Sequence, residues 1–299
     1  MANKANVLLS FWQNESKNFS TGNYIAKPDY QILKDNNLLT KKLSVYNSKN
    51  TLLYEDLPCE PFMGDIENAK IYIVTLNPGA GEDEHENWQK QDLLDVWKNN
   101  FKQTNQYPFY YLDPKLEKTG GGRYWFKREQ NDKKVWGKFE NLIEKIACDL
   151  KGQVPEEIDC FAEARKLIAQ NVCDLELCPY HSEKWNDSKN IISNLPSIKI
   201  MIEFLKDNVI PDVISGKKSL LVLRHVTEIN NVLNGVEFNY NGRKIEFKDL
   251  ETLFSDRVVF YKTSGKAARA SLKLTEEAGP VIYNQLQDKI KELVKNLNS

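Results

Sequence analysis

Long hydrophobic runs are absent from this 299-residue sequence. Its longer apolar stretches, such as 71–74 and 219–223, have the length of a β-strand, whereas a membrane-spanning helix needs about 20 apolar residues. The N-terminus, MANKANVLLSFWQNE, has too short an apolar segment for a signal peptide and no small-residue cleavage pattern. Gly (14 residues) and Pro (11 residues) are too scarce for a collagen-like or low-complexity chain. These absences predict a globular, cytoplasmic protein with no membrane partner.

A charge excess of either sign is also missing, since 41 basic residues face 42 acidic ones. This balance excludes a uniformly basic nucleic-acid coat but not a local basic face. The five cysteines form no C-x-x-C pair, which predicts reduced thiols rather than a disulfide framework or a zinc ribbon. The three histidines lie in separate segments without metalloenzyme spacing. We therefore expect no metal and no organic cofactor.

Four apolar runs have the composition of buried strands: residues 71–76, 172–177, 219–223 and 257–261. Helical periodicity lies between and after them, for example over 135–150 and 282–297, and Asn241-Gly242 predicts a hairpin within 236–247. This alternation predicts an α/β fold, with three α/β/α layers around a central four-stranded, mainly parallel sheet. We expect residues 1–60 to be a helical or irregular extension. Residues 61–299 would form the α/β domain, with an aromatic and basic insertion at about 101–135.

In open parallel sheets, ligands bind beyond the carboxyl ends of the strands. The segments that follow the four predicted strands are 77–81, 178–182, 224–227 and 262–269. Because these ends meet at one edge of a parallel sheet, we expect the four segments to share one site.

Asn77-Pro78-Gly79 follows the first predicted strand. Pro78 favours an extended backbone at Asn77, and Gly79 permits a tight turn. An asparagine held in this way can present a rigid amide to a water or a base, although the tripeptide alone is also typical of an ordinary connector. Acidic residues follow closely, among them Asp83. They could act as a general base or electrostatic stabiliser, or could form a solvated turn.

The stretch YIVTLNPGAG, which contains Asn77, resembles the first motif of the uracil-DNA glycosylase superfamily, in particular its mismatch-specific and single-strand-selective branches. Gly122-Arg123-Tyr124-Trp125 is similar to the Asn-Arg-Phe-Trp segment of the mismatch-specific branch. The resemblance implies that Asn77 positions the hydrolytic water. The superfamily's His-Pro-Ser after the last strand is replaced here by Lys262-Thr263-Ser264-Gly265-Lys266, so the histidine that donates to the departing base is absent. A group of this loop, or His181, would have to donate instead.

The resemblance also assigns base recognition, because segment 178–182 occupies the place where the superfamily reads the base. Its side chains offer several hydrogen-bond donors, and an aromatic ring nearby can stack on a flipped base. The candidate base-binding residues are Pro78, Gly79, Tyr124, Tyr180 and Ser182. A lone histidine such as His181 can equally be structural, and most of the aromatic residues between 107 and 126 can equally belong to the core.

The segment after the fourth predicted strand is basic, and no acidic residue occurs from 257 to 275. Small and basic residues together can form a nest that binds phosphates. The candidate DNA-binding residues are Arg123, Lys262, Ser264, Gly265, Lys266 and Arg269. An exposed loop with a chance charge bias is the alternative interpretation.

These observations predict a monomeric, monofunctional DNA glycosylase. It would flip a uracil-like or modified pyrimidine out of double- or single-stranded DNA and hydrolyse the N-glycosidic bond, leaving an abasic site. A hypermodified phage-type base would make it an antiviral defence enzyme rather than a DNA repair enzyme. Two other functions remain open: a non-catalytic module that binds single strands or lesions, and a hydrolase of free nucleotides.

Overall fold

The computed structural model describes residues 6–20, 22–41, 51–80, 84–126, 138–187, 189–261 and 278–299. The strands are β1 (Leu39–Thr40), β2 (Leu53–Tyr54), β3 (Phe62–Gly64), β4 (Ile71–Thr75), β5 (Val172–Glu176), β6 (Ser219–Val222), β7 (Glu237–Tyr240), β8 (Arg243–Glu246) and β9 (Val258–Phe260). The α-helices are α1 (Val7–Glu15), α2 (Lys27–Asp35), α3 (Glu84–Asn87), α4 (Gln91–Lys102), α5 (Gly120–Trp125), α6 (Glu140–Leu150), α7 (Cys160–Asn171), α8 (Pro196–Phe204), α9 (Ile210–Ile214), α10 (Val226–Val232), α11 (Leu250–Leu253) and α12 (Ala278–Leu297).

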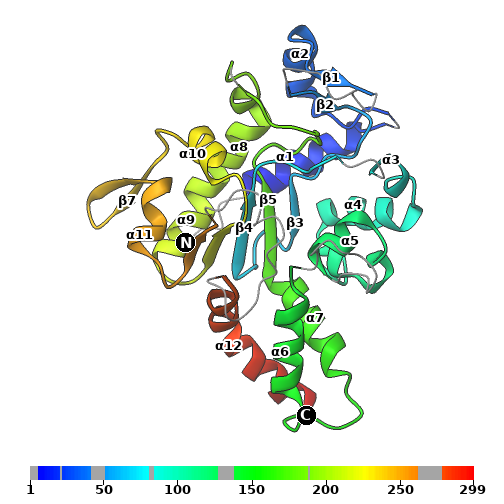
Figure 1. Cartoon of the computed structure of the whole chain (residues 1–299), viewed down its shortest axis with the longest axis vertical. Helices are drawn as coiled ribbons and strands as arrows, with labels where there is room; N and C mark the ends of the chain where they lie inside the picture. Colours follow the sequence, from blue (N-terminus) through cyan, green and yellow to red (C-terminus); the bar gives the residue numbers. More distant parts are fainter. Residues whose placement is uncertain are drawn as a thin grey trace.

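The main sheet has five strands in the order β3-β5-β4-β6-β9 (Figure 1). β5, β4, β6 and β9 pair in parallel, and β3 pairs antiparallel with β5 at the edge. The predicted α/β class is therefore confirmed. The predicted four-stranded sheet is corrected: the sheet has five strands, and its pairing is mixed because β3 is antiparallel. Both β4 and β5 are buried along their whole length, as expected for strands covered on both faces.

The strand of the main sheet that the sequence did not predict is β3, and Gly64 shows how closely it approaches its neighbour. Its φ is +129°, and a Cβ at this position would lie only 2.4 Å from the carbonyl oxygen of Val172 on β5. Only glycine fits this backbone approach. A run of three residues that ends in glycine carries no alternation, so hydrophobic periodicity could not reveal it.

Helices cover both faces of the main sheet. On one face, Ser219 of β6 donates to the Gln285 side chain of α12 at 3.1 Å. On the other face, the Tyr72 ring of β4 lies 6.4 Å from the ring of Phe204 on α8. Successive side chains of a strand point to opposite faces, and Ser219 pairs with Ile71, the residue before Tyr72. In Figure 1, α12 lies together with α6 and α7 below the sheet.

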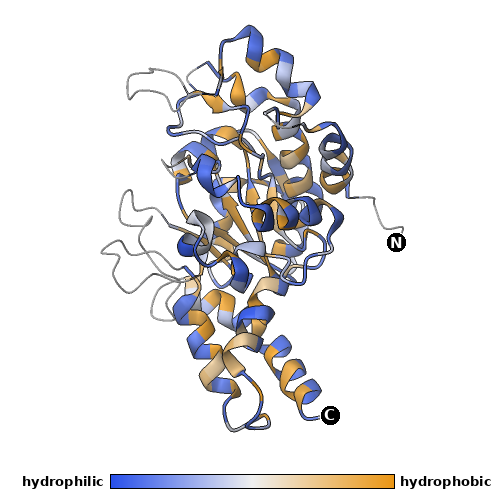
Figure 2. Ribbon diagram, turned by 90° about the vertical axis from the view of Figure 1, so that its right-hand side faces the viewer, coloured by the Kyte–Doolittle hydropathy of each residue, from blue (hydrophilic) through white to orange (hydrophobic). Residues whose placement is uncertain are grey.

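The first 60 residues contribute to the same hydrophobic core as the sheet. Leu8 and Trp12 of α1 and Tyr54 of β2 are almost completely buried. α1 contacts α4 and α8, while β1 and β2 form a separate parallel pair. Figure 2 shows the hydrophobic residues gathered on the central strands, with both kinds of residue on the surrounding helices. In the described ranges, no helix combines the length and hydrophobicity that a membrane span needs.

Local sequence signals outside the sheet also have clear counterparts. The hairpin predicted within 236–247 is formed by β7 and β8. Its turn residues Asn241 and Gly242 both have positive φ, 49° and 77°, as a tight two-residue hairpin turn requires. The helical pattern over 135–150 corresponds to α6, which begins at Glu140, and the C-terminal pattern corresponds to α12.

Candidate active site at the carboxyl edge of the sheet

The segments that follow β4 and β5 lie side by side. Gly79 and Ser182 form an isolated parallel bridge. The Ala80 amide donates to the Ser182 carbonyl at 3.1 Å, and the Ser182 amide donates to the Pro78 carbonyl at 3.2 Å. The carboxyl ends of the two central strands are therefore joined into one platform, as their positions in the sequence predicted.

Asn77 is half-buried in this platform, and its amide has a fixed orientation. Nδ2 donates to the Pro78 carbonyl at 2.9 Å and to the Ser182 hydroxyl at 2.9 Å, and the Tyr180 carbonyl lies at 3.4 Å. Backbone carbonyls can only accept, so they identify the nitrogen side of the amide. In the described part of the chain no donor reaches Oδ1. This oxygen is thus left to accept a hydrogen bond from a water or a ligand.

Pro78 is buried beside Asn77, whereas Gly79 is exposed. A Cβ built on Gly79 would meet nothing within 4 Å, and its φ lies outside the left-handed region. Neither backbone strain nor a neighbouring protein atom therefore requires glycine at this position. The open space next to Gly79 is compatible with a ligand that approaches the backbone.

His181 is completely buried and holds two loops together. Its Nδ1 lies 3.0 Å from the Gly79 carbonyl and its Nε2 lies 3.0 Å from the Pro58 carbonyl. Nε2 is also 3.4 Å from a carboxylate oxygen of Glu60. Burial lowers the pKa of His181, which favours the neutral ring with a single N–H. This enclosed position does not suit the donor to a departing base that the resemblance implied.

Tyr180 and Ser182 are also buried, and their hydroxyls have protein partners. The Tyr180 hydroxyl donates to Asp29 at 2.6 Å and accepts from the Ala26 amide at 3.2 Å, so it points to α2 rather than to Asn77. The Ser182 hydroxyl accepts from Asn77 and donates to the Lys184 carbonyl at 3.0 Å. Both residues therefore support the platform, and Ser182 orients Asn77.

The Tyr124 ring of α5 lies near two cationic side chains. The Lys138 ammonium is 5.1 Å from the ring centre, and the Arg224 guanidinium is 5.4 Å away. A base that stacked on this ring would have these two cations as neighbours. The Arg123 guanidinium beside it donates to the Lys118 carbonyl at 3.2 Å. Tyr110, Tyr111, Phe109, Trp125 and Phe126 are buried in the core.

Several predicted site residues lie outside the described residues. They are Asp83 in the acidic stretch and Lys262, Ser264, Gly265, Lys266 and Arg269 in the basic segment. The proposed roles of these residues stay predictions.

Three carboxyl groups that the sequence analysis did not select are buried under this edge. Asp174 and Glu176 project from the same face of β5, and Glu60 precedes β3; all three are at most 6% exposed. Thr75 of β4, two residues before Asn77, donates to Asp174 at 3.0 Å. Burial raises the pKa of Asp174 to about 7 and raises that of Glu176 well above its usual value. Strongly perturbed carboxyls at a ligand-binding edge are typical of functional sites.

Glu60 is held by two tyrosine hydroxyls. Tyr110 donates to its Oε1 at 2.5 Å and Tyr111 donates to the same oxygen at 2.9 Å. Burial raises the pKa of Glu60 to about 7, although both hydrogen bonds oppose this shift. Glu60 also raises the pKa values of Asp174 and Glu176 through its charge.

Arg224 follows β6 and supplies positive charge to this carboxyl cluster of Glu60, Asp174 and Glu176. Its charge favours ionisation of Asp174 and Glu176. Its buried Nε has no hydrogen-bond acceptor among the described residues. The next residue, His225, adopts a left-handed conformation with φ +57° between β6 and α10. Such a backbone is uncommon outside glycine, and it occurs often at functional sites.

The sequence did contain a signal for the carboxyl pair. In VCDLELC, which spans β5, acidic residues alternate with apolar ones, so both carboxylates project from one face of a strand that is otherwise apolar. The described residues contain no group of three or more His, Cys, Asp or Glu side chains arranged to hold a metal ion.

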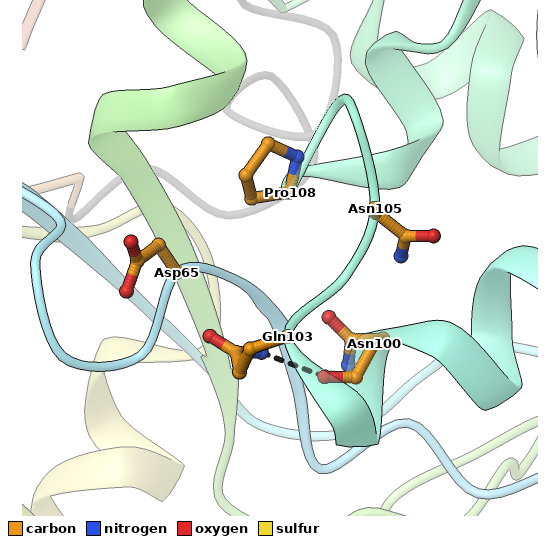
Figure 3. Close-up of a pocket in the computed structure, with 5 residues that line it drawn as sticks. All are labelled: Asp65, Asn100, Gln103, Asn105 and Pro108. Atoms are coloured by element: carbon orange, nitrogen blue, oxygen red, sulfur yellow. Dashed lines mark hydrogen bonds between the residues drawn. The ribbon is translucent and has the colours of Figure 1, made fainter.

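A small pocket lies elsewhere, and its polar groups already have structural partners (Figure 3). It is lined by Asp65, Asn100, Gln103, Asn105 and Pro108. Asn100 donates to the Phe62 carbonyl at 2.7 Å, and Gln103 donates to the Gly64 carbonyl at 3.2 Å. Because β3 is antiparallel, the pocket lies next to the start of β5, at the end of the sheet away from Asn77. These side chains fasten β3 to α4.

Comparison of the chain with protein-family models, with curated proteins and with solved structures finds no match.

Proposed function

We propose that this protein is a DNA glycosylase that hydrolyses the N-glycosidic bond of a flipped, uracil-like or modified pyrimidine and leaves an abasic site. The observation that carries the proposal is the orientation of Asn77. Its nitrogen is occupied by the platform, and its oxygen is left for a water at the carboxyl edge of the sheet. The resemblance of YIVTLNPGAG to the first motif of the uracil-DNA glycosylase superfamily, and the three-layer arrangement that it implies, agree with this role.

The reaction requires a positioned water and stabilisation of the departing base. Breaking the bond builds positive charge on the sugar and negative charge on the base. A water that donates to Asn77 Oδ1 would be oriented for attack at C1′. The charge of Arg224 acts on Asp174 and Glu176 at this edge, and its unsatisfied Nε could donate to the base. His181 is enclosed by two carbonyls, so we do not assign it this role.

The partner in this proposal is DNA, and the protein acts as a monomer without a cofactor. Gly79, with open space beside its backbone, is a point where a nucleotide can approach. Arg123 and the basic segment after β9 would contact phosphates. A base with a bulky modification would indicate a role in defence against phage DNA, whereas uracil would indicate repair.

The test is base release, measured by mass spectrometry, from single- and double-stranded DNA that contains uracil, mismatched thymine, or 5-hydroxymethylated or glucosylated cytosine. Asn77→Ala removes the oxygen that holds the water, and we expect it to lower the rate of release about 10²-fold or more. The matched control is Asn194→Ala, since Asn194 is an exposed asparagine whose amide also donates to a backbone carbonyl.

The other outcomes distinguish the alternative functions. DNA binding without release of any base, unchanged in Asn77→Ala, would favour a binding module. Hydrolysis of free nucleotides without activity on DNA would favour a nucleotide hydrolase. Either result would refute the glycosylase proposal.

A further inference from the structure

Asp174 and Glu176 form a buried carboxyl pair with unused hydrogen-bonding capacity. Asp174 is completely buried and Glu176 is 6% exposed. Thr75 donates to one oxygen of Asp174, but Asp174 Oδ2 and Glu176 Oε2 have no partner among the described residues. Leaving a buried polar atom unsatisfied costs about 1–3 kcal/mol. A pair retained at this cost is a candidate for contact with a ligand.

Asp174 and Glu176 are two residues apart on β5, so their side chains project from the same face, and the charge of Asp174 acts on Glu176. Two buried like charges that act on each other in this way cannot both ionise readily. Burial, and the charge of Asp174, raise the pKa of Glu176 well above its usual value. At neutral pH the pair therefore keeps a proton, and it offers an O–H donor next to carboxyl oxygens that can accept.

The groups around the pair support the same conclusion. Glu60, from the segment before β3, adds negative charge, and Arg224, after β6, adds positive charge that acts on both carboxyls. Tyr124 of α5 interacts with Arg224 and with both acids. Burial penalises the charged form of all three carboxyls, so the cluster retains protons. Tyr110 and Tyr111 donate to Glu60, and His181 lies beside it.

We propose that the Asp174–Glu176 pair donates a proton to the departing base, and that the substrate is a 4-aminopyrimidine, a cytosine-type base with or without a substituent at C5. This inference rests on the proposed glycosylase function. The O–H would donate to the ring nitrogen N3, and a neighbouring carboxyl oxygen would accept from the 4-amino group. Aspartate and glutamate are the usual acceptors for that amino group.

The chemistry of the leaving group explains why such a base needs an acid. Uracil departs as an anion whose charge spreads over two carbonyl oxygens. A cytosine-type base has only one carbonyl and a basic N3, so its anion is a poorer leaving group until N3 is protonated. The proton donor also takes the place of the histidine that is missing from the segment after β9, in a form suited to a different base.

In the proposed step, the C1′–N1 bond breaks and its electron pair goes to the base. The carboxyl proton moves to N3, so the base leaves as a neutral molecule. The water held by Asn77 forms the new C1′–O bond and releases one proton, which restores the protonated pair. The sum is hydrolysis, and it needs no oxidant or other reactant.

The experiment measures base release from duplexes that contain cytosine, 5-hydroxymethylcytosine or uracil, over pH 5 to 9. We expect release of a cytosine-type base, with kcat falling in the alkaline part of this range, because the pair keeps its last proton through neutral pH and then loses it. Asp174→Asn and Glu176→Gln keep the size of each side chain. They should lower kcat about 10²–10⁴-fold with little change in KM. Glu203→Gln, at an exposed glutamate of α8, is the matched control.

The outcomes separate this inference from the proposed function. Release of uracil alone, or a kcat that is unchanged in both variants, would overturn the inference and leave the glycosylase proposal standing. Absence of any released base would overturn both. The pH profile of the wild-type protein requires no substitution, so it tests the inference even where a variant does not fold.

Discussion

Replacing Glu60 by Gln should change how the stability of the protein depends on pH. Glu60 is buried, and burial raises its pKa from 4.5 to about 7. A raised carboxyl pKa means that the folded state holds the proton more tightly than the unfolded chain. Its contribution to stability is therefore complete below about pH 4.5 and is lost as the pH rises through 7. At about 1.4 kcal/mol per pH unit, this shift corresponds to about 3 kcal/mol.

Glutamine keeps the oxygen that accepts from Tyr110 and Tyr111 but cannot ionise. We therefore expect the free energy of unfolding of Glu60→Gln to rise by about 3 kcal/mol relative to the wild type between pH 4.5 and pH 8. Urea denaturation at both pH values measures this difference. Titrating groups remote from Glu60 cancel in the comparison, whereas Asp174 and Glu176, whose pKa values the charge of Glu60 raises, add to the change in the same direction. Glu203→Gln, with an exposed side chain, should show no such change. An equal gap between Glu60→Gln and wild type at both pH values would refute the reasoning.

Three further substitutions test the assigned backbone and side-chain contacts. Gly79→Ala should change the free energy of unfolding by less than about 0.5 kcal/mol, because the added Cβ meets nothing within 4 Å. Gly122→Ala should lower the free energy of unfolding by about 3 kcal/mol or more, because the added Cβ would lie 1.9 Å from the Leu116 carbonyl oxygen. Thermal unfolding compares the two, and equal losses would contradict the assigned backbone. Tyr180→Phe should cost about 1–3 kcal/mol, because it removes the 2.6 Å hydrogen bond to buried Asp29. Unchanged denaturation of this variant would show that the hydroxyl does not anchor α2.

The strands of the main sheet differ in how far the sequence predicts them. β4, β5, β6 and β9 are rich in apolar residues, as expected for strands of a sheet whose two faces are covered by helices. β3 is short, and its pairing depends on the close approach at Gly64, which is a tertiary property. The same reasoning applies to β1 and β2, whose two-residue pairing joins segments far apart along the chain.

The position of the candidate site was predictable, but the direction of its side chains was not. The rule that strand ends share an edge places Asn77 next to the segment that follows β5. It does not show that Tyr180 turns its hydroxyl towards α2, or that His181 lies between two carbonyls. Those directions depend on the N-terminal segment and on the loop before β3, which pack against the platform from distant parts of the sequence.

The carboxyl pair of β5 also shows what hydrophobic patterning leaves out. A fully buried strand in a parallel sheet is most stable with apolar side chains on both faces, and replacing buried charged groups with apolar ones is often neutral or stabilising. Asp174 and Glu176 nevertheless lie within the last three residues of β5, next to the carboxyl edge of the sheet, and the charge of Arg224 acts on both. Packing alone gives no reason for two acids there. Thr75, which donates to Asp174, lies two residues before Asn77, so the pair adjoins the Asn77 platform. This position makes a chemical role the more economical explanation. An apolar replacement that stabilises the protein while abolishing base release would agree with it.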